Sequence, residues 1–112
     1  MALHFKTATP KKLLSAFKTA IDEGKVATWS YDGDGDFTHT PQQWKSLAWL
    51  RPKVVDGADL ILTIIKPNNS KISSEVYAVY HGRFIESMLV HCDSLFQEAY
   101  ATAMPADGDV IS

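Results

Sequence analysis

Three residues at a predicted junction between a strand and a helix are of types that could carry acid–base chemistry. His81, Arg83 and Glu86 surround Gly82, and active sites of many folds lie where a strand passes into a helix. His81 could act as a general base, or it could be a histidine at the edge of the core that bonds a carbonyl. Arg83 and Glu86 are three positions apart and could form an exposed ion pair. Since no second histidine or nucleophile stands at a telling spacing, catalysis is the weaker interpretation.

Asp32, Asp34 and Asp36 form a second group that could bind a ligand. They alternate with glycines and precede His39, a spacing similar to the start of a calcium-binding EF-hand loop. An EF-hand places glycine at the sixth position and a bidentate glutamate at the twelfth, where this chain has phenylalanine and glutamine. A polar hairpin tip, in which glycines supply positive φ and aspartates bond nearby amides, therefore competes with a metal site at these aspartates and His39.

Aromatic side chains gather in the first half of the chain, close to arginine and lysine. Such a group could stack on single-stranded nucleic acid. However, the formal net charge is -2 and the isoelectric point is near 6.0, which gives no general attraction to nucleic acid or to an anionic membrane. We therefore expect core and interface anchors that bind a protein. The candidate binding residues are Trp44, Phe37, His39, Trp49 and Arg51.

Length and composition indicate one ordinary globular domain. The chain has 112 residues, of which 46% are hydrophobic and 21% charged, and this suffices for a single core. Cys92 is the one cysteine and lies on the apolar side of a predicted helix, so we expect a buried thiol in a reducing compartment. The start of the sequence lacks the apolar run of a signal peptide, and no segment reaches the length of a membrane span. A cytoplasmic protein without a cofactor is predicted.

The local patterns predict an α+β fold. Thr9 and Pro10 are typical of a helix start, and Gly24 is typical of a helix end. The pair Asp56–Gly57 between two apolar runs predicts a β-hairpin, and Pro52 is expected to place its first strand at an edge or a bulge. The predicted strands cover 25–31, 37–39, 48–55, 59–66 and 75–81.

The stretch from Ser73 to Ala103 organises this prediction. A buried strand over 75–81 is followed by a break at Gly82 and a long amphipathic helix. At roughly 100° per residue, the apolar positions of that helix fall in one arc. They are Phe84, Ile85, Met88, Leu89, Cys92, Leu95, Phe96 and Ala99. We therefore predict an antiparallel meander of four to five strands, with the N-terminal and C-terminal helices packed on one face.

Two of the predicted strands are apolar on both faces, which leaves one sheet face without a cover. The runs 60–65 and 76–80 do not alternate apolar with polar residues, as strands that face water on one side do. Two helices cover only one face, so the second face is expected to meet a partner chain, a ligand or the chain's own aromatic loop. Residues 1–103 are expected to form the domain, and 104–112 a flexible tail.

These patterns favour a small cytoplasmic binding or interaction protein, homodimeric through the second sheet face, for which an inhibitor or immunity type of role would fit. The alternative is a small enzyme or metal-dependent protein that uses the 32–39 loop with His81, Arg83 and Glu86. The arrangement in space separates the two hypotheses, because the alternative requires the loop and His81 to converge on one pocket.

Overall fold

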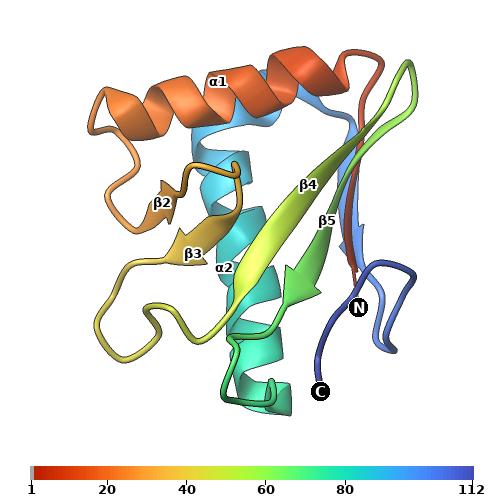
Figure 1. Ribbon diagram of the computed structural model, residues 1–112. Helices are drawn as coiled ribbons and strands as arrows, with labels where there is room; N and C mark the ends of the chain where they lie inside the picture. The colour runs from red at the N-terminus through yellow and green to blue at the C-terminus, as the bar shows by residue number, and fades with distance from the viewer. Residues whose placement is uncertain (1) are drawn as a thin grey trace.

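The protein folds as a six-stranded antiparallel sheet with two α-helices, and this confirms the predicted α+β class (Figure 1). The computed structural model describes residues 2–112. The strand order is β2-β3-β4-β5-β1-β6, so strands from the two ends of the chain lie side by side. The strands are β1 (Ala2–Lys6), β2 (Trp29–Tyr31), β3 (Phe37–His39), β4 (Trp49–Val55), β5 (Asp59–Ile65) and β6 (Glu98–Ala101). The helices are α1 (Pro10–Asp22) and α2 (Ser74–Cys92).

Neither helix within residues 2–112 has the combination of length and apolar character that would let it cross a membrane. Helix α1 lies across one end of the sheet, and α2 runs behind β3 and β4 in the view of Figure 1. Side chains from both helices join those of β1, β4 and β5 in one buried cluster. One layer of helices therefore packs on one side of the sheet.

The longest ladder joins β4 to β5, and its turn follows from the sequence Asp56–Gly57. All seven residues of each strand are paired. Gly57 has a φ of 75°, which a residue without Cβ adopts at no steric cost. On the other side of β4, β3 pairs only at Leu50. The strand is therefore an open edge at Pro52, which has no N–H to offer a neighbour.

Helix α1 begins and ends as the sequence predicts. Thr9 is the N-cap residue and Pro10 the first helical residue, although the Thr9 side chain makes no capping hydrogen bond. Leu13 and Phe17 are buried against the sheet. Gly24 follows the last turn with a φ of 75°, the left-handed conformation that ends many helices.

The strand predicted at 75–81 is wrong, because these residues form the first turns of α2. Ser73 is the N-cap, and its hydroxyl accepts a hydrogen bond from the N–H of Val76 at 3.2 Å. The buried residues of α2 are Tyr77, Tyr80, His81, Phe84, Ser87, Met88 and Cys92. Their separation is helical rather than alternating. A short run of β-branched and aromatic residues fits a strand or a buried helix equally well, and here the capping serine and the helical spacing decide.

The C-terminal helix also ends earlier than predicted. It ends at Cys92, and one 3₁₀ turn, η1 (Asp93–Leu95), leads into β6. Four residue pairs join β6 to β1. The local pattern predicts neither strand, because each is short and gains its stability from a partner at the other end of the chain.

The segment expected to be a flexible tail, 104–112, is hydrogen-bonded to β5 near its end. The N–H of Val110 donates to the carbonyl of Ile64 at 2.8 Å, and the N–H of Lys66 donates to the carbonyl of Val110 at 2.7 Å. The Asp109 carboxylate accepts from the N–H of Ile64 at 2.9 Å. The tail thus pairs in parallel with the end of β5, on the side where β1 no longer reaches.

Phe84 of α2 lies at the centre of the core. Between ring centroids, it is 4.9 Å from Phe17 of α1 and 5.0 Å from Trp29 of β2. It is also 5.4 Å from Phe37 of β3 and 6.0 Å from Phe5 of β1. Most of these pairs are edge-to-face, the geometry that aromatic rings prefer. A single side chain therefore joins α2 to four other elements.

The predicted apolar arc of α2 is partly wrong. Phe84, Met88 and Cys92 are buried as predicted, but Leu89 is 52% exposed. Contacts around Phe84 fix the rotation of the helix, and Leu89 falls outside the buried sector. Burial raises the pKa of the Cys92 thiol, and the negative charge of Asp93 adds to this rise. This thiol is therefore poorly reactive.

We expect Phe84→Ala to lower the free energy of unfolding by about 3–5 kcal/mol, since it empties the centre of the aromatic cluster. Leu89→Ala, five residues further along α2, should cost less than about 1 kcal/mol because that side chain is half exposed. Urea unfolding followed by circular dichroism measures both. Similar losses for the two variants would contradict this rotation of α2.

Candidate functional site

The acidic loop joins β2 to β3 and folds around the carboxylate of Asp32. One Asp32 oxygen accepts the backbone N–H groups of Asp34 and Asp36, each at 3.0 Å. The N–H of Gly35 donates to the Asp32 carbonyl at 2.9 Å. These are the local bonds that the hairpin-tip interpretation predicts. Within residues 2–112, no three histidine, cysteine, aspartate or glutamate side chains gather closely enough to hold a metal ion.

Asp36 is held by an arginine on the neighbouring strand β4. The Arg51 side chain donates from Nε and a terminal nitrogen to the two carboxylate oxygens, at 3.2 and 3.0 Å. The Asp36 side chain is 8% exposed, whereas that of Arg51 is 55% exposed. The hydrogen bonds that Arg51 donates to Asp36, together with the Asp36 charge, raise the pKa of the Arg51 guanidinium. The bidentate pair fixes the acidic loop to the sheet, so Asp36 has a structural role.

His39 is buried in β3 rather than exposed beside the acidic loop. Its Nδ1 lies 2.7 Å from the carbonyl oxygen of Thr28, and because a carbonyl only accepts, Nδ1 carries the proton. The ring is 1% exposed and lies 4.6 Å from the Trp29 ring. Burial lowers the pKa of His39; the Thr28 hydrogen bond opposes this, while Arg83 lowers the pKa and Glu86 raises it. His39 is therefore a neutral core histidine.

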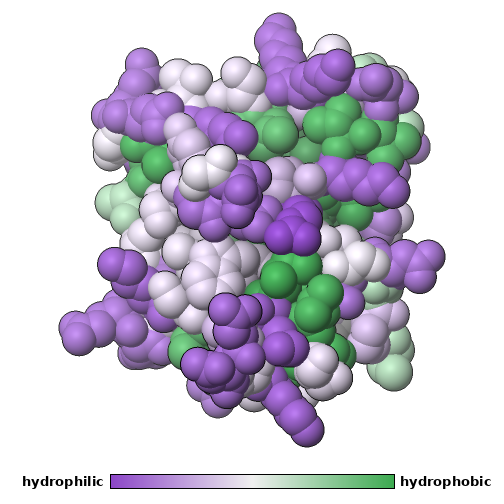
Figure 2. Space-filling model, viewed as in Figure 1, coloured by the Kyte–Doolittle hydropathy of each residue, from purple (hydrophilic) through white to green (hydrophobic). Residues whose placement is uncertain are grey.

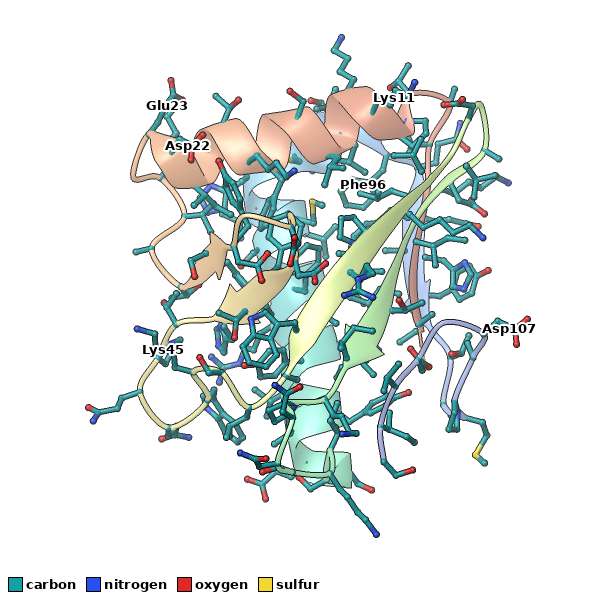
Figure 3. The ribbon with its side chains drawn as sticks, viewed as in Figure 1. Lys11, Asp22, Glu23, Lys45, Phe96 and Asp107 are labelled. Atoms are coloured by element: carbon teal, nitrogen blue, oxygen red, sulfur yellow. The ribbon has the colours of Figure 1, made fainter. Side chains whose placement is uncertain are left out.

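Two buried hydroxyls close the 40–48 loop onto the core. The Tyr80 hydroxyl of α2 donates to the carbonyl of Trp44 and lies 3.1 Å from the Thr38 hydroxyl. The Thr38 hydroxyl accepts the N–H of Ser46 at 3.1 Å. Burial raises the pKa of Tyr80, which keeps the hydroxyl protonated as a donor. Trp44 remains partly exposed on this loop, and Lys45 beside it projects away from the protein (Figure 3).

His81 lies on the side of α2 that faces β6. Its Nδ1 is 2.7 Å from the carbonyl oxygen of Tyr77, and the two rings stack at 4.4 Å. It lines a hollow of about 430 Å³ between α2 and the end of β6. The other lining residues are Ser74, Tyr77, Ala78, Ala101, Thr102 and Ala103. The aspartates of the acidic loop line a different hollow of about 340 Å³, beside the 65–68 turn. The loop and His81 thus lie at separate hollows.

The remaining candidate residues differ in whether their side chains are exposed or buried. Arg83 and Glu86 lie on the exposed side of α2, where their charges act on His39. Phe37 is fully buried and cannot contact a partner. Trp49 and Arg51 lie on β4, opposite the helices, and both are accessible. The candidate binding residues therefore divide between the core and one face of the sheet.

The face of the sheet opposite the helices, here called the outer face, carries residues that the sequence does not single out. Since side chains alternate along a strand, the register places them together. They are Trp49, Arg51 and Lys53 on β4, Ile61, Thr63 and Ile65 on β5, His4 on β1 and Tyr100 on β6. Four of them, Lys53, Ile61, His4 and Tyr100, are successive register partners across four strands. Short alternating patterns at 2–6 and 98–101 are the only sequence signal for His4 and Tyr100, which make up half of this row.

No protein-family model, curated protein or solved structure matches the chain.

We expect Asp36→Asn to lower the free energy of unfolding by roughly 1–2 kcal/mol, since it weakens two charge-assisted hydrogen bonds to a half-exposed arginine. Asp34→Asn removes an exposed carboxylate of the same loop and should change stability by less than about 0.5 kcal/mol. Thermal and urea unfolding of the two variants provide the comparison. An equal effect would show that the pair with Arg51 does not hold the loop.

We expect stability to fall as the pH drops below about 6.5, and His39 to account for part of that loss. The pKa of His39 is lowered in the folded state, so between the folded and unfolded values the unfolded chain binds more protons. Protonation then favours unfolding. His39→Gln should show a smaller loss between pH 7 and pH 5 than the wild type. His91→Gln, at an exposed position of α2, is the matched control and should keep the wild-type dependence. A wild-type slope in His39→Gln would refute the assignment.

Proposed function

We propose that the protein is a small cytoplasmic binding protein whose outer face contacts another protein. The observation that carries the proposal is the row formed by Lys53, Ile61, His4 and Tyr100, which crosses four strands on the helix-free side of the sheet. A stack of His4 on Tyr100, 4.6 Å between centroids and 4° between planes, stiffens one end of the row. Tyr100 is 51% exposed.

The composition of the outer face suits a protein partner. Trp49, Tyr100 and Arg51 are of the residue types that contribute most to protein interfaces. Lys53 adds a second positive charge on β4. In Figure 2, apolar patches alternate with hydrophilic residues over the visible side of the molecule. A partner with carboxylates set among apolar residues would complement such a surface.

The alternative hypothesis, a small enzyme or metal-dependent protein, loses support because several of its candidate residues stabilise the fold. Asp36 is bonded to Arg51, His39 to the Thr28 carbonyl and His81 to the Tyr77 carbonyl. An enzyme that uses the acidic loop with His81 would need them at one pocket, and they line different hollows. The free, buried Cys92 fits a reducing compartment such as the cytoplasm.

The outer face is assigned to a different protein rather than to a second copy. A homodimer through this face would need two apolar runs in the sheet, and one of them, 76–80, lies in α2. In the other run, Thr63 separates Ile61 from Ile65 on the outer face, and Arg51 and Lys53 lie beside them. This mixed surface does not demand an apolar cover.

A photo-reactive amino acid in place of Lys53 should form an adduct with a second protein in cells, whereas the same group in place of Ser15, exposed on α1, should not. Adding Arg51→Gln, which retains a donor toward Asp36 and removes the charge, should reduce the yield at position 53. Adducts of equal yield from both positions would refute the proposed surface. An adduct between two copies of this chain alone would restore the homodimer through the outer face.

A further inference from the structure

Strand β6 forms one end of the sheet and has an open edge. Among residues 2–112 it pairs only with β1. The N–H of Thr102 donates to the carbonyl of Ala2 at 2.9 Å, and His4 is the register partner of Tyr100. In an antiparallel ladder the bonded residues alternate. The N–H and C=O groups of Ala99 and Ala101 therefore point away from β1, toward the side where no strand follows.

The helical layer also stops short of β6. Ala101 is the register partner of Leu3, which is fully buried, so both residues face the helices. Ala101 is nevertheless exposed. The hollow of about 430 Å³ beside His81 lies over this part of β6, with Ala78 of α2 on its opposite wall. The core-facing side of β6 thus lacks a cover at Ala101, although Ala99 packs partly against the core.

An apolar stripe on α2 flanks this uncovered strand. Ala78 lines the hollow beside β6, and Ile85 and Leu89 follow it by seven and eleven positions. At 100° per residue, these three side chains lie within about 40° of one another. Leu89 is 52% exposed, and the space around Gly82 on the same flank is open, with no atom within 4 Å of a Cβ built there. Ile85 is half-buried against the core, whereas Ala78 and Leu89 on either side of it are exposed, so the stripe has the composition of a packing surface and is only partly covered.

We propose that a second copy of this chain covers both features, by pairing its own β6 with β6 across a two-fold axis. The two six-stranded sheets then become one continuous sheet. The α2 helices of both copies lie on the same side of it, with their stripes facing each other over the alanines of β6. This inference does not depend on the proposed function, because Lys53, Ile61 and His4 lie on the opposite side of the sheet, away from the paired edge.

The register of the pairing follows from which groups are free. Ala99 pairs with Ala101 of the second copy and exchanges both hydrogen bonds with it, and the symmetric pair repeats the exchange. Tyr100 then lies opposite Tyr100 of the second copy, on the outer face and close to the axis. Glu98 lies opposite Thr102 of the second copy, so no two like charges meet.

A second copy fits better than an unrelated strand because one symmetric contact supplies both a strand partner for β6 and an apolar cover for its core-facing side. An antiparallel edge is complementary to itself under a two-fold rotation. The same rotation brings an apolar helix stripe to each uncovered strand. In addition, β6 has neither lysine nor proline, the residues that commonly protect a free edge from pairing.

Light scattering should give a mass near 25 kDa, twice the 12.4 kDa of the chain. Ala101→Pro removes an N–H that points away from β1 and should restore the monomer without breaking the β1–β6 ladder. Leu89→Lys should do the same by placing a charge in the helix contact. Val90→Lys, at a residue 68% exposed on the other flank of α2, is the matched control and should remain a dimer. Circular dichroism verifies that each variant is folded.

A monomer mass for the wild-type chain at every concentration would overturn the inference. So would a dimer that survives Ala101→Pro and Leu89→Lys but is lost in Ile61→Lys, since Ile61 lies on the outer face. A monomer mass has no bearing on adduct formation at Lys53, whereas a dimer lost in Ile61→Lys would also predict adducts between two copies at Lys53. Failure of this dimer and failure of the proposed binding surface are therefore distinguishable.

Discussion

The packing of Phe84 against four aromatic rings is the contact on which the rest of the structure depends. Phe5, Phe17, Trp29 and Phe37 belong to β1, α1, β2 and β3, and each lies within 6.0 Å of the Phe84 ring, measured between centroids. This cluster joins the start of the chain to its middle and fixes the rotation of α2. All the surfaces discussed above follow from that rotation, because it directs some apolar residues of α2 into the core and leaves others at the flank beside β6.

The sequence predicts well the elements whose signals are local. The turn at Asp56–Gly57, the start of α1 at Pro10 and the hairpin tip around Asp32 each depend on residues a few positions apart. The prediction fails where a distant partner decides. The run 75–81 is compatible with a strand or a helix, and β1 and β6 are too short to be recognised without each other. Leu89 belongs to the predicted arc by periodicity, but the cluster around Phe84 sets where that arc ends.

The candidate site shows the same division between local and long-range information. Asp32 bonds nearby amides, as the hairpin-tip interpretation of the 32–36 loop predicts. The hydrogen bond from Arg51 to Asp36 depends on the contact between β3 and β4, which the sequence does not reveal. His39 follows the aspartates in the sequence, which makes it a candidate ligand beside them. In the structure its Nδ1–H donates to the Thr28 carbonyl, and the ring is buried in the core. The outer face could not be predicted as a unit, since half of its row comes from the two missed strands.

The core leaves open a backbone edge at β6 and a mixed side-chain face on the outer side of the sheet. Amide hydrogen exchange, followed residue by residue at low and at high protein concentration, separates the two sides of β6. We expect the Ala99 and Ala101 amides, which point away from β1, to exchange quickly in dilute solution and to become protected as concentration rises. The Tyr100 amide, directed at β1, should stay protected throughout. Rapid exchange of Ala99 and Ala101 at every concentration, with Tyr100 protected, would show that nothing pairs with this edge and would contradict the account.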